Sequence, residues 1–227
     1  MMKTVSTSIE TGLGWHFSLG HVGYPNFRKI AAGVTHTADV EPVLGESGLH
    51  DSMRIIDALR RAPGHVPGPV LARTSLGGAV AQDNGTRCGT ERTYLAVIDA
   101  SAILHKFACR CAERAARTGN PDPRSVAAIG AKRAWLRGEI TDEHLAAARG
   151  AAWDVDPGSG WFSIAPPTRA AAWAAAWAAD SCATRAAVNA AAWAVDSAEC
   201  EWQNDELTRI ALESLAEVGY TEEQAAQ

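Results

Sequence analysis

The segment between Thr168 and Ala198 constrains the fold of this chain more than any other part of the sequence. Sixteen of its 31 residues are alanine, the residue with the highest intrinsic helix propensity. Alanine buries little area, but each tryptophan in the segment adds a ring that can bury about 150–250 Å². The sequence therefore predicts one long Ala/Trp-rich helix, capped by Thr168 and running to about Val218.

The tryptophans of this predicted helix form two faces. On a helical wheel Trp173, Trp177 and Trp202 fall within a narrow arc, and Trp193 falls nearly opposite. Each face needs a neighbour, because a large exposed apolar surface usually marks a contact. Both faces could pack within one monomer, or one could bind a partner protein or a second copy in a homodimer. These four tryptophans are therefore candidate partner-binding residues.

The first part of the chain has the short, turn-separated pattern of a small sheet. The strand candidates are Gly12 to Ser18, Ile30 to Thr37, Pro69 to Leu76 and Thr93 to Ile98. Between them, Ser47 to Ser52 is predicted to be a loop, with Asp51 or Ser52 capping a helix from Met53 to Arg61. Gly77-Gly78 predicts a turn or a β-bulge.

The second part of the chain is predicted to be helical. One amphipathic helix runs from about Ser101 to Arg117, a second covers Ser125 to Arg137, and a third begins at Thr141. We therefore expect an α+β protein, with a small mixed or antiparallel sheet domain at residues 1–99 and a helical domain at residues 100–227.

Charge is distributed unevenly along this helical part. Residues 100–138 hold eight lysines and arginines against two acids, whereas residues 196–227 hold nine acids against one arginine. The candidate charged surface is the first stripe, at Lys106, Arg110, Arg114 and Arg117. It could pair with the acidic end of the chain, or meet an acidic partner or nucleic acid. Nucleic acid is not favoured, because no aromatic residues interleave the stripe at base-stacking spacing.

Motifs of common enzyme classes are absent from the sequence. It has no phosphate-binding Gly-Lys-Ser/Thr loop, no Gly-x-Ser-x-Gly elbow, no His-Glu-x-x-His and no Cys-x-x-Cys. We therefore expect no catalytic residues, no cofactor and no metal. His50 is the one candidate pocket residue, because it precedes a predicted helix cap. The enzymatic alternative is an ADP-ribosyltransferase-like site that combines His50 with a later glutamate such as Glu91.

Several features place the chain in the cytoplasm. The odd count of five cysteines suggests reduced thiols. The start of the sequence lacks the apolar stretch of a secretory signal. The longest apolar run, Ala170 to Ala179, is about half the length that a bilayer requires. We expect a soluble, intracellular protein that does not insert into a membrane.

A series of short motifs resembles a group of phage and bacterial proteins of unknown function. They are Gly48-Leu49-His50-Asp51-Ser52, Asp57-Ala58-Leu59, Pro63-Gly64, Val70-Leu71-Ala72-Arg73, Leu76-Gly77-Gly78, Arg92-Thr93 and Asp99-Ala100, followed by the Ala/Trp-rich segment. The resemblance covers roughly residues 45–200 and implies a phage or mobile-element origin. Small acidic proteins of that origin often block host machinery, so it suggests a non-catalytic accessory protein that binds a host defence complex, of the anti-CRISPR type.

Overall fold

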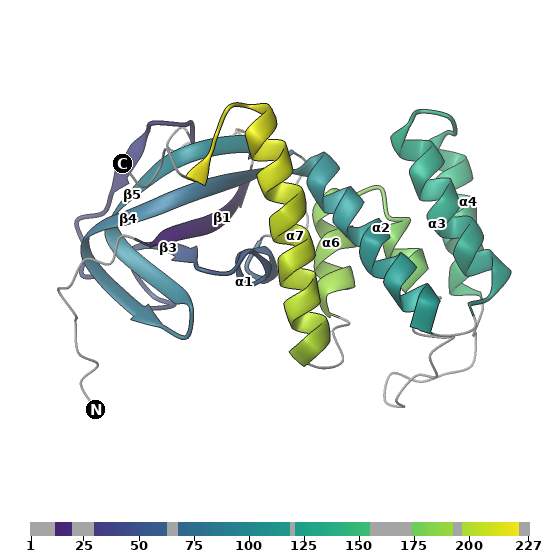
Figure 1. The fold of residues 1–227 in the computed structure, drawn as a ribbon, viewed down its shortest axis with the longest axis horizontal. Helices are drawn as coiled ribbons and strands as arrows, with labels where there is room; N and C mark the ends of the chain where they lie inside the picture. Colours follow the sequence, from purple (N-terminus) through teal and green to yellow (C-terminus); the bar gives the residue numbers. More distant parts are fainter. Residues whose placement is uncertain are drawn as a thin grey trace. The chain divides into compact units, whose positions relative to one another are not determined.

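The chain folds into two compact units that together make an α+β architecture, as predicted (Figure 1). The computed structural model describes residues 12–19, 30–62, 68–118, 121–154, 174–192 and 197–222. One unit comprises Met1–Ala100 together with Leu207–Gln227, and the other comprises Ser101–Glu206. The predicted domain boundary lies beside Ala100, whereas the last residues of the predicted helical domain cluster with the first unit.

The first unit is built on an antiparallel five-stranded sheet. Its strands are β1 (Leu13–Leu19), β2 (Thr35–Thr37), β3 (Leu49–Ser52), β4 (Pro69–Asp83) and β5 (Thr86–Asp99). They follow the order β2-β5-β3-β1-β4, and β4 also pairs with β5, so the sheet closes on itself. Closure brings residues that are far apart in the sequence to one small interior.

The long β4–β5 hairpin turns at Asn84 and Gly85, which both have positive φ angles of 47° and 77°. Two such residues in succession are typical of a tight hairpin turn. The register shifts between Gly77 and Val80, so the predicted turn or bulge at Gly77-Gly78 is confirmed as a bulge. Both strands continue beyond it, and β4 therefore extends past its predicted end.

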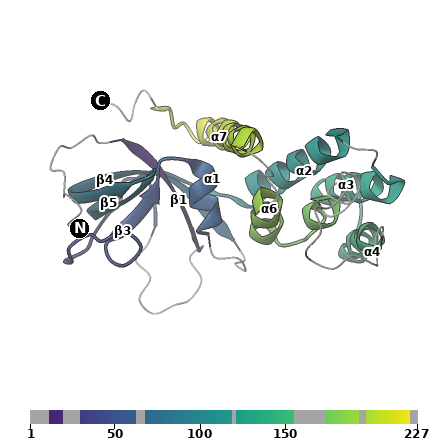
Figure 2. The same ribbon diagram turned by 90° about the horizontal axis from the view of Figure 1, so that it is seen from below.

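Helix α1 (Ile55–Arg60) follows β3 and lies beside β1 and β3 (Figure 2). Its residues Ile55, Ile56 and Leu59 are fully buried in the core of the first unit. The predicted cap at Asp51 or Ser52 is wrong, because the N-cap is Arg54 without a side-chain cap.

The predicted loop from Ser47 to Ser52 is also wrong over its last four residues, where Leu49–Ser52 forms β3. These four residues pair with Thr86 to Gly89 of β5. This pairing is long-range, so the polar, glycine-containing local sequence did not indicate it.

The second unit contains α2 (Ser101–Thr118), α3 (Pro123–Leu136), α4 (Asp142–Trp153) and α6 (Ala183–Ala192). Helix α7 (Ser197–Glu217) begins in this unit and ends in the first. The predicted start of a helix at Thr141 is confirmed, since the Thr141 side chain accepts a hydrogen bond from the backbone N–H of His144. Helix α2 packs against α6 and α3, and α3 packs against α4 (Figure 1).

The prediction of one long Ala/Trp-rich helix is wrong in its middle. Residues 174–178 are helical, but the helix stops at Asp180 and α6 starts only at Ala183. The Asp180 carboxylate accepts hydrogen bonds from the backbone of Cys182 and from Arg185, and its carbonyl accepts one from the Nζ of Lys132 at 2.6 Å. These contacts stabilise a break that the alanine propensity alone would not produce.

Candidate functional site

A cavity of about 320 Å³ lies in the first unit, beside the point where β1 and β3 pair at Trp15 and Ser52. Its walls come from four elements. They are Trp15 to Phe17 of β1, the segment from Gly48 to Ser52, Ala58 and Arg61 in and just after α1, and Arg92 of β5. His50, the candidate pocket residue identified from the sequence, therefore does line a cavity.

Arg92 is the buried cation of this cavity, with 7% of its surface exposed. Its Nη1 donates hydrogen bonds to the carbonyl of His50 at 2.6 Å and to Nδ1 of His16 at 3.3 Å. Its Nη2 donates to the hydroxyl of Tyr94 at 2.6 Å. Its Nε is buried without a hydrogen-bond partner. These hydrogen-bond partners are neutral, and the carboxylate of Asp51 is near enough to interact with the guanidinium charge without pairing with it.

His16 remains neutral beside Arg92. Burial, helped by the nearby charge of Arg92 and by His36, lowers the pKa of His16 to about 3. Since Nδ1 of His16 faces a guanidinium N–H, this nitrogen acts as the acceptor. The imidazole therefore adds no positive charge at neutral pH and leaves Arg92 as the cation at this end of the cavity.

Asp51 lies close to Arg92 but is engaged by other groups. Its two carboxylate oxygens accept hydrogen bonds from Nε and Nη2 of Arg87 at 2.9 and 2.8 Å, and a third bond comes from Thr74. Burial raises the pKa of Asp51, and the hydrogen bonds from Arg87 and Thr74 oppose this rise. In the part of the chain that the structure describes, no carboxylate is paired with Arg92.

The mouth of the cavity carries a second positive charge at Arg61. This exposed residue donates from Nη2 to the hydroxyl of Thr86 at 2.6 Å. His50 accepts a hydrogen bond at Nε2 from the backbone N–H of Gly45 at 3.0 Å. A neutral His50 then carries its proton on Nδ1, where it can donate to a bound acceptor.

The structure does not bring Glu91 to His50. Adjacent side chains on a strand point to opposite faces of the sheet, and Arg92 lines the cavity whereas Glu91 is exposed. The sequence reasoning missed Arg92 and His16 as site residues. A signal for Arg92 was available, because it lies two residues before Tyr94, at the start of the strand predicted from Thr93 to Ile98, and residues two apart on a strand share a face.

Two of the four candidate partner-binding tryptophans have ring contacts inside the second unit. Trp177 is half-buried and meets Trp153 edge-to-face at 5.5 Å, and half-buried Trp202 lies under the guanidinium of Arg114 at 4.4 Å. Trp173 and Trp193, like the predicted cap Thr168, lie outside the described residues. Partner binding through these tryptophans stays a prediction.

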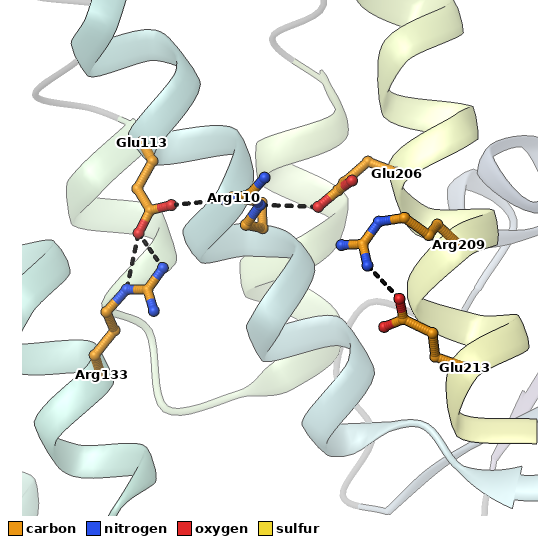
Figure 3. Close-up of polar contacts among 6 residues, drawn as sticks. All are labelled: Arg110, Glu113, Arg133, Glu206, Arg209 and Glu213. Carbon is orange, nitrogen blue, oxygen red and sulfur yellow. Dashed lines mark hydrogen bonds and ion pairs between the residues drawn. The ribbon is translucent and has the colours of Figure 1, made fainter. Parts of the chain in front are cut away.

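The basic stripe of α2 is partly neutralised within its own unit. Arg110 pairs with Glu206 of α7 at 2.8 Å, and Arg133 of α3 pairs with Glu113 (Figure 3). Arg114 pairs with Glu199 at 2.6 Å. The match between the basic stripe and the acidic end of the chain, one of the alternatives drawn from the sequence, is therefore present at Arg110 and Arg114. Lys106 and Arg117 are exposed.

Neither a metal site nor a membrane span is found in the described parts of the chain. No three His, Cys, Asp or Glu side chains there are placed to hold a metal ion. No helix among the same residues combines the length and the apolar character needed to cross a bilayer.

Comparison of the chain with protein families, with curated proteins and with solved structures finds no match. The resemblance to phage and bacterial proteins therefore stays a prediction, and the functional argument depends on the geometry of the site.

Proposed function

We propose that the first unit binds a small organic anion, with a carboxylate or phosphate group, in the cavity between β1, β3 and α1. The observation that carries this proposal is the buried guanidinium of Arg92, which lacks a paired carboxylate and keeps one N–H without a partner. Arg61 at the mouth adds a second positive charge.

The proposal follows from the cost of burying charge. Removing a charged group from water costs several kcal/mol unless an opposite charge and hydrogen bonds compensate. Here neutral oxygen and nitrogen acceptors compensate only in part, because they supply dipoles and no negative charge. An anion in the cavity would provide the missing charge, and arginine suits this role because it binds carboxylates and phosphates through paired N–H groups.

The cavity walls favour an anion that carries an apolar body. Trp15, Phe17, Leu49 and Ala58 contribute apolar surface, and the polar lining comes from His16, His50, Asp51, Ser52 and the two arginines. The volume of about 320 Å³ lies at the lower end of the range for small-molecule sites. An aromatic or branched carboxylic acid, or a small phosphate monoester, matches both features.

Isothermal titration calorimetry with benzoate and phenyl phosphate tests the proposal. Arg61→Gln should weaken binding roughly tenfold, as expected for the loss of one charge-assisted contact. Arg60→Gln is the matched control, because Arg60 precedes Arg61 in the chain and pairs with Asp57 at 3.3 Å instead of lining the cavity. Absence of heat for both probes up to about 10 mM, or equal losses in the two variants, would contradict the proposal.

This function differs from the protein-binding role expected from the sequence. A non-catalytic accessory protein that binds a host defence complex stays a prediction. The ADP-ribosyltransferase-like alternative loses its proposed glutamate, since Glu91 is exposed beside the cavity-lining Arg92. Anion binding requires neither a nucleophile nor a general base, and it uses the groups that the cavity holds.

A further inference from the structure

His50 brings a hydrogen-bond donor to the cavity, and the protein fixes which ring nitrogen carries it. Its Nε2 accepts a hydrogen bond from the backbone N–H of Gly45 at 3.0 Å, so the proton of the neutral ring is on Nδ1. Among the residues that the structure describes, none forms a hydrogen bond with Nδ1. Because the half-buried His50 lines the cavity, its Nδ1–H group is available to a ligand.

Two contacts hold His50 in place. Its carbonyl accepts a hydrogen bond from Nη1 of Arg92 at 2.6 Å. Gly45, which binds the ring, lies in the turn that precedes β3, and this turn is closed by backbone hydrogen bonds between Val43 and Ser47. The donor of His50 and the cation of Arg92 therefore belong to adjacent parts of one wall.

The other polar side chains of the cavity offer a ligand few acceptors. The side chain of Asp51 is 0% exposed, and its oxygens already accept three hydrogen bonds within the protein. Nδ1 of His16 accepts from Arg92, and the hydroxyl of Ser52 is able to donate as well as accept. The cavity therefore suits an anion whose second polar group accepts hydrogen bonds, whereas an ammonium group would lie among cations and donors.

We infer that the anion of this cavity is a 2-oxo acid with an apolar side chain. Its carboxylate lies beside Arg92 and Arg61, and its 2-oxo oxygen accepts a hydrogen bond from the Nδ1–H group of His50. The matching 2-amino acid binds more weakly, because it places an ammonium group where the site requires an acceptor. This inference rests on the proposed anion binding and specifies the class of anion.

Calorimetric titration of the full-length chain with phenylacetate, benzoylformate and 2-phenylglycine tests the inference, because these ligands share one carbon skeleton and differ at carbon 2. Benzoylformate should bind roughly tenfold more tightly than phenylacetate, as expected for one added hydrogen bond, and 2-phenylglycine should bind more weakly than either. His50→Leu should abolish the preference for benzoylformate, whereas His144→Leu, at an exposed histidine of the second unit, should retain it. The comparison of ligands in wild-type protein requires no variant to fold.

Three results would overturn the inference while leaving anion binding intact. The first is equal affinity of wild-type protein for benzoylformate and phenylacetate, and the second is a preference for benzoylformate that persists in His50→Leu. The third is tighter binding of 2-phenylglycine than of benzoylformate, which would assign the cavity to a 2-amino acid. Absence of binding by all three ligands would instead contradict the anion-binding proposal, and the inference with it, so the two failures are distinguishable.

Discussion

Arg87 and Asp51 form a buried ion pair, in which Nε and Nη2 of the guanidinium donate to separate carboxylate oxygens at 2.9 and 2.8 Å. The side chains are 3% and 0% exposed. Gly14 leaves room for the pair, because a Cβ at this position would lie 2.0 Å from Oδ2 of Asp51. The pair joins β3 to β5, and Asp51 forms part of the wall of the cavity.

Replacing Asp51 with Asn should destabilise the first unit by about 3–5 kcal/mol, because it leaves Arg87 buried and unpaired. Urea unfolding followed by circular dichroism measures this change. Asp57→Asn is the control, since its pair with Arg60 is partly exposed, and it should cost less than about 1 kcal/mol. Similar losses of unfolding free energy in the two variants would show that the buried Asp51–Arg87 pair stabilises the fold no more than the partly exposed Asp57–Arg60 pair does.

The break in the Ala/Trp-rich segment should depend on Asp180. Its carboxylate is fully buried and pairs with Arg149 at 3.0 Å and with Arg185. Asp180→Ala should destabilise the second unit by about 3–5 kcal/mol, because two arginines lose their counter-ion. Ser181, the exposed neighbour of Asp180, provides the control. Ser181→Ala should change the free energy of unfolding by less than about 0.5 kcal/mol. If Asp180→Ala left the stability of the second unit unchanged, the break in the Ala/Trp-rich segment would have a cause other than the Asp180 contacts.

The stability of the second unit should fall in acid because of His105. Burial and the nearby charge of Lys132 together lower the pKa of His105 to about 4. In the unfolded chain, His105 therefore becomes protonated below about pH 6.5, whereas in the folded chain it becomes protonated only near pH 4. The free energy of unfolding should decrease across this window, by up to about 3 kcal/mol at its lower end.

Urea unfolding at a series of pH values checks this effect by comparing wild type with His105→Phe. The variant should lose less stability than wild type between pH 6.5 and pH 4, the window set by the two pKa values. His144→Ala, which removes an exposed histidine of α4, should follow the wild-type curve. Parallel curves for wild type and His105→Phe would exclude His105 as the source of acid sensitivity.

Local signals predicted much of the secondary structure. The strand at Thr93 to Ile98 lies within β5, the helix from Ser101 matches α2, and Thr141 begins α4 at its capping side chain. These elements depend on neighbouring residues: β-branched and aromatic runs, apolar spacing, and capping side chains.

Errors arose where distant contacts override local preference. Leu49–Ser52 becomes β3 because it pairs with β5, and the alanine-rich helix stops at Asp180 because Lys132 and Arg149 reach it from α3 and α4. The long β4–β5 hairpin could have been predicted, since Asn84-Gly85 is a strong hairpin signal.

Of the residues that line the cavity, only His50 was identified from the sequence as a candidate pocket residue. The other residues that give it its chemistry, His16, Arg61 and Arg92, come from β1, from the residue after α1 and from β5. Closure of the sheet brings them together, and a single sequence contains no register information that would show this.

The proposed anion would bind beside the buried guanidinium of Arg92. The most direct measurement is the arginine Nε–H signal in ¹⁵N-correlated NMR spectra, assigned to Arg92 by its loss in Arg92→Lys, during titration with benzoate. Anion binding should shift this signal and protect the Nε–H group from exchange with water, while the Nε–H signal of Arg60 should not move. A spectrum in which benzoate leaves the Arg92 signal unchanged, or moves both signals equally, would contradict it.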